Sequence, residues 1–188
     1  MKFLVLGGGA QGSAAAFDLV RRDVVDEVVI ADQKAGNVRP FLRPFVGGKL
    51  QYAALDATDH GAVREAMEGM DAVVCGLPYF FNYDIAEVAV EEGCHYCDLG
   101  GNTEIVERQR TLHERAKAQG VSVIPDCGLA PGMVNILAQA GIDALAAFGA
   151  PTTALPYTAL LDRDGRIVAG HVGELEREDA LALLEGVL

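Results

Sequence analysis

Three glycines near the start of the chain stand directly after a short apolar run. They are Gly7, Gly9 and Gly12. The residues that follow suit a helix, so these glycines would form the turn between a buried strand and that helix. Such a turn leaves backbone amides unpaired at the positive end of the helix dipole, which favours a phosphate. We therefore expect the amides near Ala10, Gln11 and Gly12 to face a diphosphate.

The spacing of these glycines is G-x-G-x-x-G, and each position has its own physical role. Gly7 permits the tight turn, Gly9 lets a pyrophosphate approach the backbone, and Gly12 lets the helix pack closely on the sheet. A second apolar run ends in Asp32, about 20 residues further on, as dinucleotide-binding domains require. The alternative is a glycine-rich turn that binds no ligand.

Asp32 favours NAD over NADP as the cofactor. A carboxylate accepts hydrogen bonds from the adenosine ribose hydroxyls but repels a 2′-phosphate. The cations Lys34, Arg39 and Arg43 follow within a few residues and could fold over a 2′-phosphate, so NADP stays as the less favoured alternative.

Two more segments follow predicted strands and belong to the same site. The carboxyl ends of parallel strands form the edge at which open α/β sheets bind ligands. The first segment should lie near the adenine, and the second beside the pyrophosphate and the nicotinamide ribose. An alternative role for Asp56 is to cap the following helix. The residues are Asp56 and Ala57 in the first segment and Gly76, Leu77 and Pro78 in the second.

Alternating apolar and amphipathic stretches supply the elements that must position these residues. The expected strands are 2–6, 27–31, 49–55, 71–75, 94–99 and 121–125. The expected helices are 11–22, 58–68, 82–92 and 103–119, the last two capped by Asn82 and Thr103. Strands that alternate with helices predict a parallel sheet covered on both faces. Prolines and glycines in 33–48 predict a loop or a broken helix.

The alternation of strands and helices ends after the sixth strand. Pro131 suits the first turn of a helix that ends near residue 147. Residues 157–161 and 166–170 form a predicted hairpin, and the acidic, glycine-ended segment 162–165 forms its turn. An amphipathic helix over 174–188 closes the chain.

Composition and charge limit the function classes. The net charge of −12 argues against nucleic-acid and anionic-membrane partners. No secretory signal or membrane-length apolar run is visible, which predicts a cytoplasmic protein with four reduced cysteines. Cys94 and Cys97 have the spacing of a redox pair, but their place at the start of a strand directs them to opposite faces. A thiol–disulfide function is therefore disfavoured, and a zinc site is no better supported.

The first part of the chain, residues 1 to about 142, resembles the saccharopine dehydrogenase family, and most closely its lysine 6-dehydrogenase branch. The resemblance lies in five motifs: residues 7–12, 56–59, 76–78, 98–101 and 126–133. It implies an NAD(P)-dependent oxidation at a carbon that bears an amine. It also implies that Asp98, Gly100, Asp126 and Cys127 line the nicotinamide side of the cleft. Asp126 would act there in proton transfer or, as the favoured alternative, as a structural residue.

The tail, residues 148–188, resembles the last third of a thioredoxin-like protein. The resemblance lies in residues 150–153, 155–158, 161–165 and 172–173, with Pro156 at the cis-proline position. Two families in one chain suggest an engineered chimera with domains 1–147 and 148–188. Its fold class would be α/β, a Rossmann-type parallel sheet extended by an antiparallel thioredoxin-like β-hairpin and a C-terminal helix. We expect 157–161 to run antiparallel beside 121–124 and so to cover the sheet edge.

These observations favour an NAD-binding chimera without catalytic activity. The large second domain that completes the substrate pocket in the family has no counterpart here, and without it substrate orientation and exclusion of water both fail. The alternative is an NAD-dependent oxidoreductase that acts on the CH–NH2 group of lysine or a related amino acid. Apolar surface on the helix before residue 147 would also favour self-association, such as a homodimer, if the tail leaves it uncovered.

Overall fold

The computed structural model describes residues 1–188 except 35, 37, 131, 148–156, 175 and 186–188. Its contacts divide the chain into two compact units, Met1–Gly132 and Met133–Leu188. The predicted domain boundary after residue 147 stays a prediction. Within the described part of the chain, no helix is both long and apolar enough to span a bilayer.

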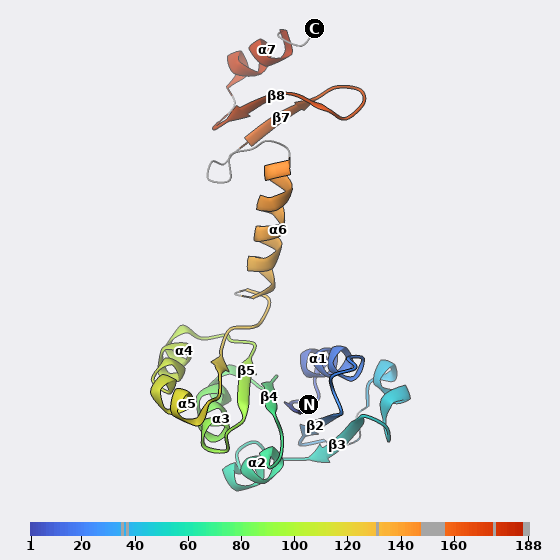
Figure 1. Ribbon diagram of the computed structural model, residues 1–188, viewed down its shortest axis with the longest axis vertical. Coiled ribbons are helices and arrows are strands. Elements are labelled where there is room, and N and C mark those ends of the chain that lie inside the picture. Colours follow the sequence, from blue (N-terminus) through green and yellow to red (C-terminus); the bar gives the residue numbers. More distant parts are fainter. Residues whose placement is uncertain (35, 37, 131, 148–156, 175, 186–188) are drawn as a thin grey trace. The chain divides into compact units, whose positions relative to one another are not determined.

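A six-stranded parallel sheet forms the centre of the first unit (Figure 1). Its strand order is β3-β2-β1-β4-β5-β6, which confirms the predicted Rossmann-type sheet. The order reverses between β1 and β4, and open α/β sheets bind their ligands at this switch point. The strands are β1 (Lys2–Leu6), β2 (Glu27–Asp32), β3 (Leu50–Ala54), β4 (Ala72–Cys75), β5 (His95–Asp98) and β6 (Val123–Ile124).

Two hydrophobic cores lie on the two faces of this sheet. Leu4, Leu6 and Cys75 belong to one core and Val5 and Ile30 to the other, because neighbouring residues of a strand point to opposite faces. The 3-10 helix η1 (Pro40–Phe45) and helix α1 (Ala10–Val20) pack on the second face, where Phe17 of α1 meets the Phe41 and Phe45 rings of η1 edge-on. The strands are therefore buried on both sides, as a parallel sheet requires.

The helices of this unit lie between the same strands as predicted, but they begin and end at different residues. The expected helix 103–119 is two helices, because Thr111 and Leu112 donate their N–H groups only three residues back, to Arg108 and Gln109, and interrupt the α pattern. The broken segment 33–48 contains η1, as predicted. The helices are α1 (Ala10–Val20), η1 (Pro40–Phe45), α2 (His60–Met67), η2 (Tyr79–Phe81), α3 (Asn82–Glu91), α4 (Thr103–Arg110) and α5 (His113–Gln119).

Two predicted helix caps are wrong. Asn82 is the first residue of α3, and its side-chain oxygen accepts from the Cys75 thiol at 3.6 Å instead of capping the helix. The cap of α4 is Asn102, whose Oδ1 accepts from the Ile105 N–H at 3.1 Å, and Thr103 is only the first helical residue. For α4, the neighbouring polar residue has the better position relative to the exposed amides.

The second unit contains helix α6 (Met133–Ala147), strands β7 (Tyr157–Leu161) and β8 (Ile167–Val172), and helix α7 (Arg177–Glu185). The strands form the predicted antiparallel hairpin, with Leu160 opposite Ala169. Asp162 closes the turn, where its Oδ1 accepts from the N–H groups of Asp164 and Arg166 at 2.9 Å each. The expected proline of the first helical turn, Pro131, and the expected cis-proline, Pro156, lie outside the described residues.

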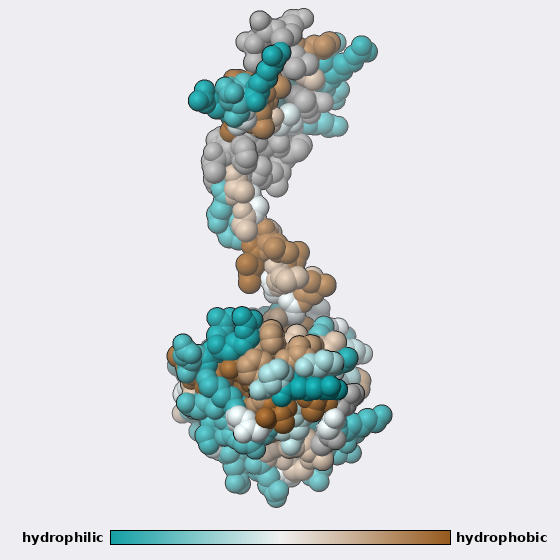
Figure 2. All heavy atoms as spheres, turned by 90° about the vertical axis from the view of Figure 1, so that its right-hand side faces the viewer, coloured by the Kyte–Doolittle hydropathy of each residue, from teal (hydrophilic) through white to brown (hydrophobic). Residues whose placement is uncertain are grey.

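The expected pairing of the hairpin with the large sheet stays a prediction. In the second unit β7 pairs with β8, and in the first unit β6 pairs with β5. The β6 strand is shorter than the expected 121–125. Hydrophobic side chains also gather on the exposed surface of α6 (Figure 2), among them Met133, Val134, Ile136 and Leu137.

Candidate functional site

The glycine loop joins β1 to α1 at the carboxyl edge of the sheet. Gly7 has a φ of 94° and donates its N–H to the Ala31 carbonyl oxygen at 2.9 Å, which ties the loop to β2. A side chain is strained at this φ, so glycine is required there. A Cβ atom on Gly12 would overlap the Gly7 carbonyl oxygen. Gly12 therefore serves the close packing of α1 on the loop, as predicted.

Gly9 differs from both neighbours because the protein itself leaves space beside it. A Cβ atom on Gly9 would meet no atom within 4 Å. Gly9 is also the N-cap of α1, and no side chain caps the helix, so its first amides have no side-chain acceptor. Ala10 and Gln11 are exposed at this end. An anion would therefore find both room and hydrogen-bond donors here.

Ser13 is a residue of this loop that the sequence interpretation missed. It is buried, its hydroxyl donates to the Gly8 carbonyl oxygen at 3.0 Å, and its N–H donates to the Gly9 carbonyl oxygen at 3.0 Å. Both bonds hold the loop against the first turn of α1. Its position directly after the last glycine of the motif was the available signal.

Asp32 ends β2 and is half-buried beside the glycine loop. Its Oδ2 accepts from the Gly8 N–H at 2.8 Å and its Oδ1 from the Lys34 N–H at 2.9 Å. The carboxylate is therefore fixed by the backbone on both sides, and it joins the glycine loop to the segment after β2. The predicted acid and the predicted glycines do come together in space.

The segment after β3 gives the predicted residues different environments. Asp56 is exposed, and its Oδ1 accepts from the N–H and the hydroxyl of Thr58 at 3.0 and 2.8 Å, which lowers the pKa of the carboxyl group. Asp59, not Asp56, caps α2, through bonds from the Gly61 and Ala62 amides. Ala57 is 7% exposed and its methyl group belongs to the core, so only its backbone could reach a ligand.

The segment after β4 lies directly against the glycine loop. Gly76 donates its N–H to the Leu6 carbonyl oxygen at 2.8 Å, and a Cβ atom on it would lie 3.4 Å from Gly12 Cα. A Cβ atom on Gly7 would lie 3.3 Å from Cδ2 of Leu77. Pro78 directly precedes η2. These residues therefore continue the edge of the site from the glycine loop toward β4.

A buried aspartate organises the next two loops of the same edge. Asp98 ends β5 and has no exposed surface. Its Oδ1 accepts from the N–H groups of Gly100 and Asp126 at 2.7 and 3.2 Å, and its carbonyl oxygen accepts from Cys127 at 2.8 Å. Asp126 adopts a φ of 60°, unusual for a residue with a side chain. Asp98 thus holds together the residues that the family resemblance assigned to the nicotinamide side.

The other oxygen of Asp98 belongs to a buried polar network that sequence reasoning missed. Gln109 of α4 donates to Asp98 Oδ2 at 2.6 Å and to the Asn82 carbonyl oxygen at 3.4 Å. The Tyr96 hydroxyl donates to the same carbonyl oxygen at 3.1 Å. Burial raises the pKa of Tyr96 well above its usual value and that of the Cys75 thiol to about 11. The Tyr96 hydroxyl and the Cys75 thiol therefore stay protonated at neutral pH.

The environments of Cys94 and Cys97 disfavour a redox pair. All four are free, and Cys94 is buried with its thiol 2.9 Å from the Met70 carbonyl oxygen. Burial raises the pKa of Cys94, and it raises that of Cys97 to about 11, whereas a reactive pair needs a stabilised thiolate. Among the described side chains, no group of three or more acidic, histidine or cysteine residues is placed to hold a metal.

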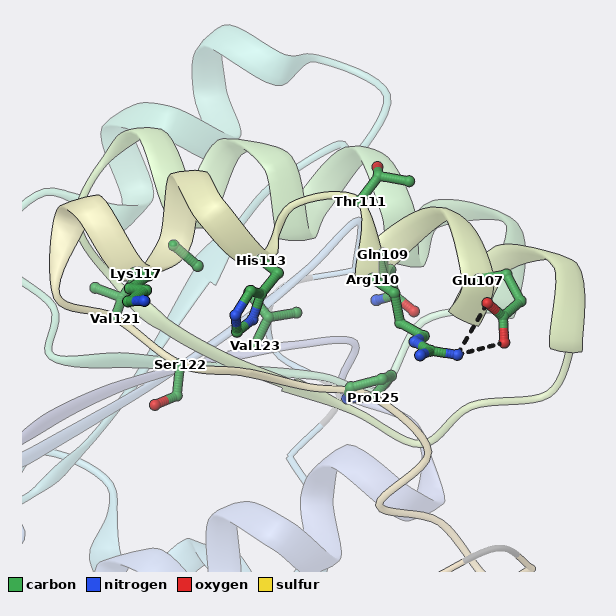
Figure 3. A pocket seen from close by; sticks show the side chains of 11 residues that line it. Glu107, Gln109, Arg110, Thr111, His113, Lys117, Val121, Ser122, Val123 and Pro125 are labelled. Carbon is green, nitrogen blue, oxygen red and sulfur yellow. Dashed lines mark hydrogen bonds and ion pairs between the residues drawn. The ribbon is translucent and has the colours of Figure 1, made fainter.

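A cavity of about 960 Å³ lies away from the glycine loop, between α4, α5 and β6 (Figure 3). Gln109, Lys117 and Ser122 line it, together with the ion pair of Arg110 with Glu107, whose closest atoms are 3.0 Å apart. None of the residues predicted to bind the cofactor lines this cavity. The carboxyl edge of the sheet, not this cavity, is therefore the candidate functional site.

Comparisons with known proteins identify the family of the first unit. Residues 3–124 match the family model "Saccharopine dehydrogenase NADP binding domain". Saccharopine dehydrogenase [NADP(+), L-glutamate-forming] of Saccharomyces cerevisiae is 26% identical over 140 residues, which are 74% of this chain and 30% of that protein. This chain therefore spans about a third of the length of that relative.

Solved structures show the same fold. The apo histidine-tagged saccharopine dehydrogenase (L-Glu forming) from Saccharomyces cerevisiae superimposes with a TM-score of 0.62 at 22% identity, over 85% of this chain and 33% of that one. Pen from Bacillus thuringiensis gives a TM-score of 0.52 at 14% identity, over 66% and 48%. The family match covers more than half of the sequence, and the glycine loop, Asp32 and the uncapped α1 fit a dinucleotide. The chain thus carries an NAD(P)-binding Rossmann domain and belongs to the family of the saccharopine dehydrogenase NADP binding domain.

Proposed function

We propose that this chain is the cofactor-binding part of an oxidoreductase that uses NADP(H) at a carbon–nitrogen bond of an amino acid. The observation that carries the proposal is the open space at Gly9 beside the uncapped amides of α1. There the diphosphate would lie on the glycine loop, and Asp32 would mark the adenosine end. When bound, the cofactor would supply or accept a hydride. The residues of this chain would hold and orient it.

Cations after β2 support NADP over NAD. Lys34, Arg39 and Arg43 are exposed and take part in no ion pair among the described residues. They lie in the segment that leaves β2 beside the adenosine end. The yeast relative is NADP-dependent by name, and the family model describes an NADP binding domain. These cations would hold the 2′-phosphate and offset its repulsion by Asp32.

NAD is the second candidate, and Asp32 is the observation that favours it. Its carboxylate lies at the end of β2, where it could accept hydrogen bonds from both ribose hydroxyls. A titration calorimeter distinguishes the two cofactors, because the chain has no tryptophan for a quenching assay. If NADP is the cofactor, NADP+ should bind more tightly than NAD+. Lys34→Ala or Arg39→Ala should then lower the NADP+ affinity by about tenfold. Lys117→Ala on α5 removes an equal charge elsewhere and should change neither affinity.

We also infer that these 188 residues bind the cofactor without turnover. The match to the yeast relative covers 30% of that protein, and the family match ends at residue 124. The thioredoxin-like origin of residues 148–188 and the chimera remain hypotheses. Absorbance at 340 nm tests turnover: oxidation of lysine or saccharopine in the presence of NADP+ or NAD+ at a rate above the protein-free control would refute the inference.

A further inference from the structure

Two exposed aromatic rings stand at the end of the candidate site where the nicotinamide would lie. Tyr79 and Phe80, here named the aromatic shelf, directly follow Pro78 and belong to η2. Their exposed fractions are 44% and 58%, and their rings contact edge-to-face with centroids 5.8 Å apart. Aromatic rings contribute most of their free energy of interaction when they are buried. Two of them left in contact with water at a ligand-binding edge need an explanation.

The shelf is held firmly in place. Phe81 packs partly buried against the core, its ring centroid lies 4.7 Å from that of Phe80, and its N–H donates to the Pro78 carbonyl oxygen at 3.0 Å. The next residue, Asn82, is 2% exposed and accepts from Tyr96 and Gln109. The exposed rings are therefore tied to the buried polar network and to the core, so they are not part of a loose surface loop.

A dinucleotide bound along the candidate site would end at the shelf. Asp32 marks the adenosine end on β2, and the glycine loop of β1 receives the diphosphate. The strand order then places β4 next and β5 after it. The segment after β4 touches the glycine loop through Gly76 and Leu77 and leads directly to Tyr79. On the β5 side, a Cβ atom on Gly101 would lie 3.2 Å from Cβ of Tyr79, so the shelf borders both loops of this edge.

We propose that the aromatic shelf packs against the nicotinamide ring of the bound dinucleotide and so fixes the end of the cofactor that exchanges the hydride. This inference rests on the proposed cofactor function. A planar ring buries apolar surface on an aromatic neighbour, and the oxidised nicotinamide carries a positive charge that the negative face of an aromatic ring attracts. Phe80, the more exposed of the two residues, carries most of the contact.

The test compares each cofactor with a fragment that lacks nicotinamide. Calorimetry compares the affinity of NADP+ with that of 2′-phospho-ADP-ribose, and the affinity of NAD+ with that of ADP-ribose. Each comparison is made in the unchanged chain and in the variants Phe80→Ala, Tyr79→Ala and Phe41→Ala. Phe41 is a control of the same residue type, 45% exposed on η1. In the unchanged chain we expect the complete cofactor to bind about tenfold more tightly than its fragment.

Phe80→Ala should remove most of this difference and leave the fragment affinity unchanged, which also shows that the variant is folded. Tyr79→Ala should remove part of the difference, and Phe41→Ala none of it. Equal affinities of cofactor and fragment in the unchanged chain would overturn the shelf while leaving the cofactor function intact. An equal loss for both ligands in Phe80→Ala would overturn it as well. Failure of every ligand to bind would refute the cofactor function itself, and the shelf with it.

Discussion

The three glycines of the loop serve three different physical purposes although they belong to one motif. Gly7 is required by its backbone conformation and Gly12 by the carbonyl oxygen that its side chain would overlap. Gly9 has open space beside it, so nothing in the protein itself requires a glycine there. A glycine that the fold does not need, at a helix N-terminus without a side-chain cap, supports the proposed diphosphate site.

This difference predicts opposite outcomes for two equal substitutions. Gly12→Ala should destabilise the protein by about 1–3 kcal/mol, because the added methyl group has no room. Gly9→Ala should change the free energy of unfolding by no more than about 0.5 kcal/mol but weaken cofactor binding by about tenfold or more. Urea denaturation and calorimetry measure the two effects. If Gly9→Ala keeps the full cofactor affinity, the assignment of this loop to the diphosphate is wrong.

The buried thiol of Cys75 predicts a loss of stability at alkaline pH. Its pKa in the folded protein is about 11, against a usual value of 9.0, because burial disfavours the thiolate. The protonated form is therefore favoured by folding, and its contribution is complete below pH 9 and lost as the pH rises toward 11. The shift of about two units corresponds to roughly 2–3 kcal/mol.

Chemical denaturation at about pH 8 and about pH 11 measures this loss. Cys75→Ala should lower the stability at the lower pH but show a smaller further decrease between the two pH values. Cys127→Ala, at an exposed cysteine whose pKa partial burial also raises, should reduce the slope less than Cys75→Ala does. A slope that is identical in Cys75→Ala and in the unchanged protein would contradict the assignment of the alkaline loss to this thiol.

At the scale of elements, helix α4 contacts the candidate site through the side chain of Gln109. Gln109 reaches from α4 to Asp98 at the end of β5, and Asp98 in turn holds the loops after β5 and β6. Gln109 also leaves its Oε1 without a partner in the described residues. Burying this side chain therefore leaves one acceptor unsatisfied, but it gives a buried carboxylate oxygen a donor. The second effect is the larger in free energy, because an unpaired buried carboxylate is costlier than an unpaired amide oxygen.

Gln109→Met should accordingly destabilise the protein by about 1–3 kcal/mol, because Asp98 Oδ2 loses its donor while the volume is nearly kept. Urea denaturation measures the loss. Gln119→Met, on the exposed end of α5, is the matched control and should stay within about 0.5 kcal/mol of the unchanged protein. Equal stability of the two variants would show that the Gln109 bond contributes nothing.

The predicted helices and strands were wrong mainly in the residues at which they begin and end. Alternation of apolar runs located all six parallel strands and the helices between them, because burial on both faces leaves a strong local pattern. The Asn82 and Thr103 caps and the single helix 103–119 were wrong. The capping residue is the one, among several adjacent polar residues, whose side chain reaches an exposed amide. The break at Thr111 depends on how α4 and α5 pack. The polar network had no local signal, because its members are distant in sequence.

At the scale of the whole molecule, the exposed apolar surface of α6 predicts self-association. Ile136 and Leu137 are 71% and 60% exposed, and Met133 and Val134 lie one turn before them. Contiguous apolar surface of this kind favours association. We expect analytical ultracentrifugation to show a mass above that of one chain at high concentration, and Ile136→Asp to reduce it to one chain.

The control for this prediction is Asn135→Asp, which adds the same negative charge on the adjacent, already polar residue. If it dissociates the protein as completely as Ile136→Asp, general charge repulsion is the cause and not the loss of apolar contact. A single-chain mass for the unchanged protein at every concentration would contradict self-association directly.

The sequence by itself determined the Rossmann sheet, the glycine loop, the acid at the end of β2 and the hairpin. Each of these depends on backbone geometry or burial within a few residues, so the pattern is local. Only the tertiary structure showed that Gly9 borders open space where Gly7 and Gly12 do not, and that Asp98 holds two loops and accepts from Gln109. It also placed exposed aromatic rings at the carboxyl edge of the sheet. These features depend on atoms brought together from distant segments, and the free energy of such contacts is decided by packing that no short stretch of sequence encodes.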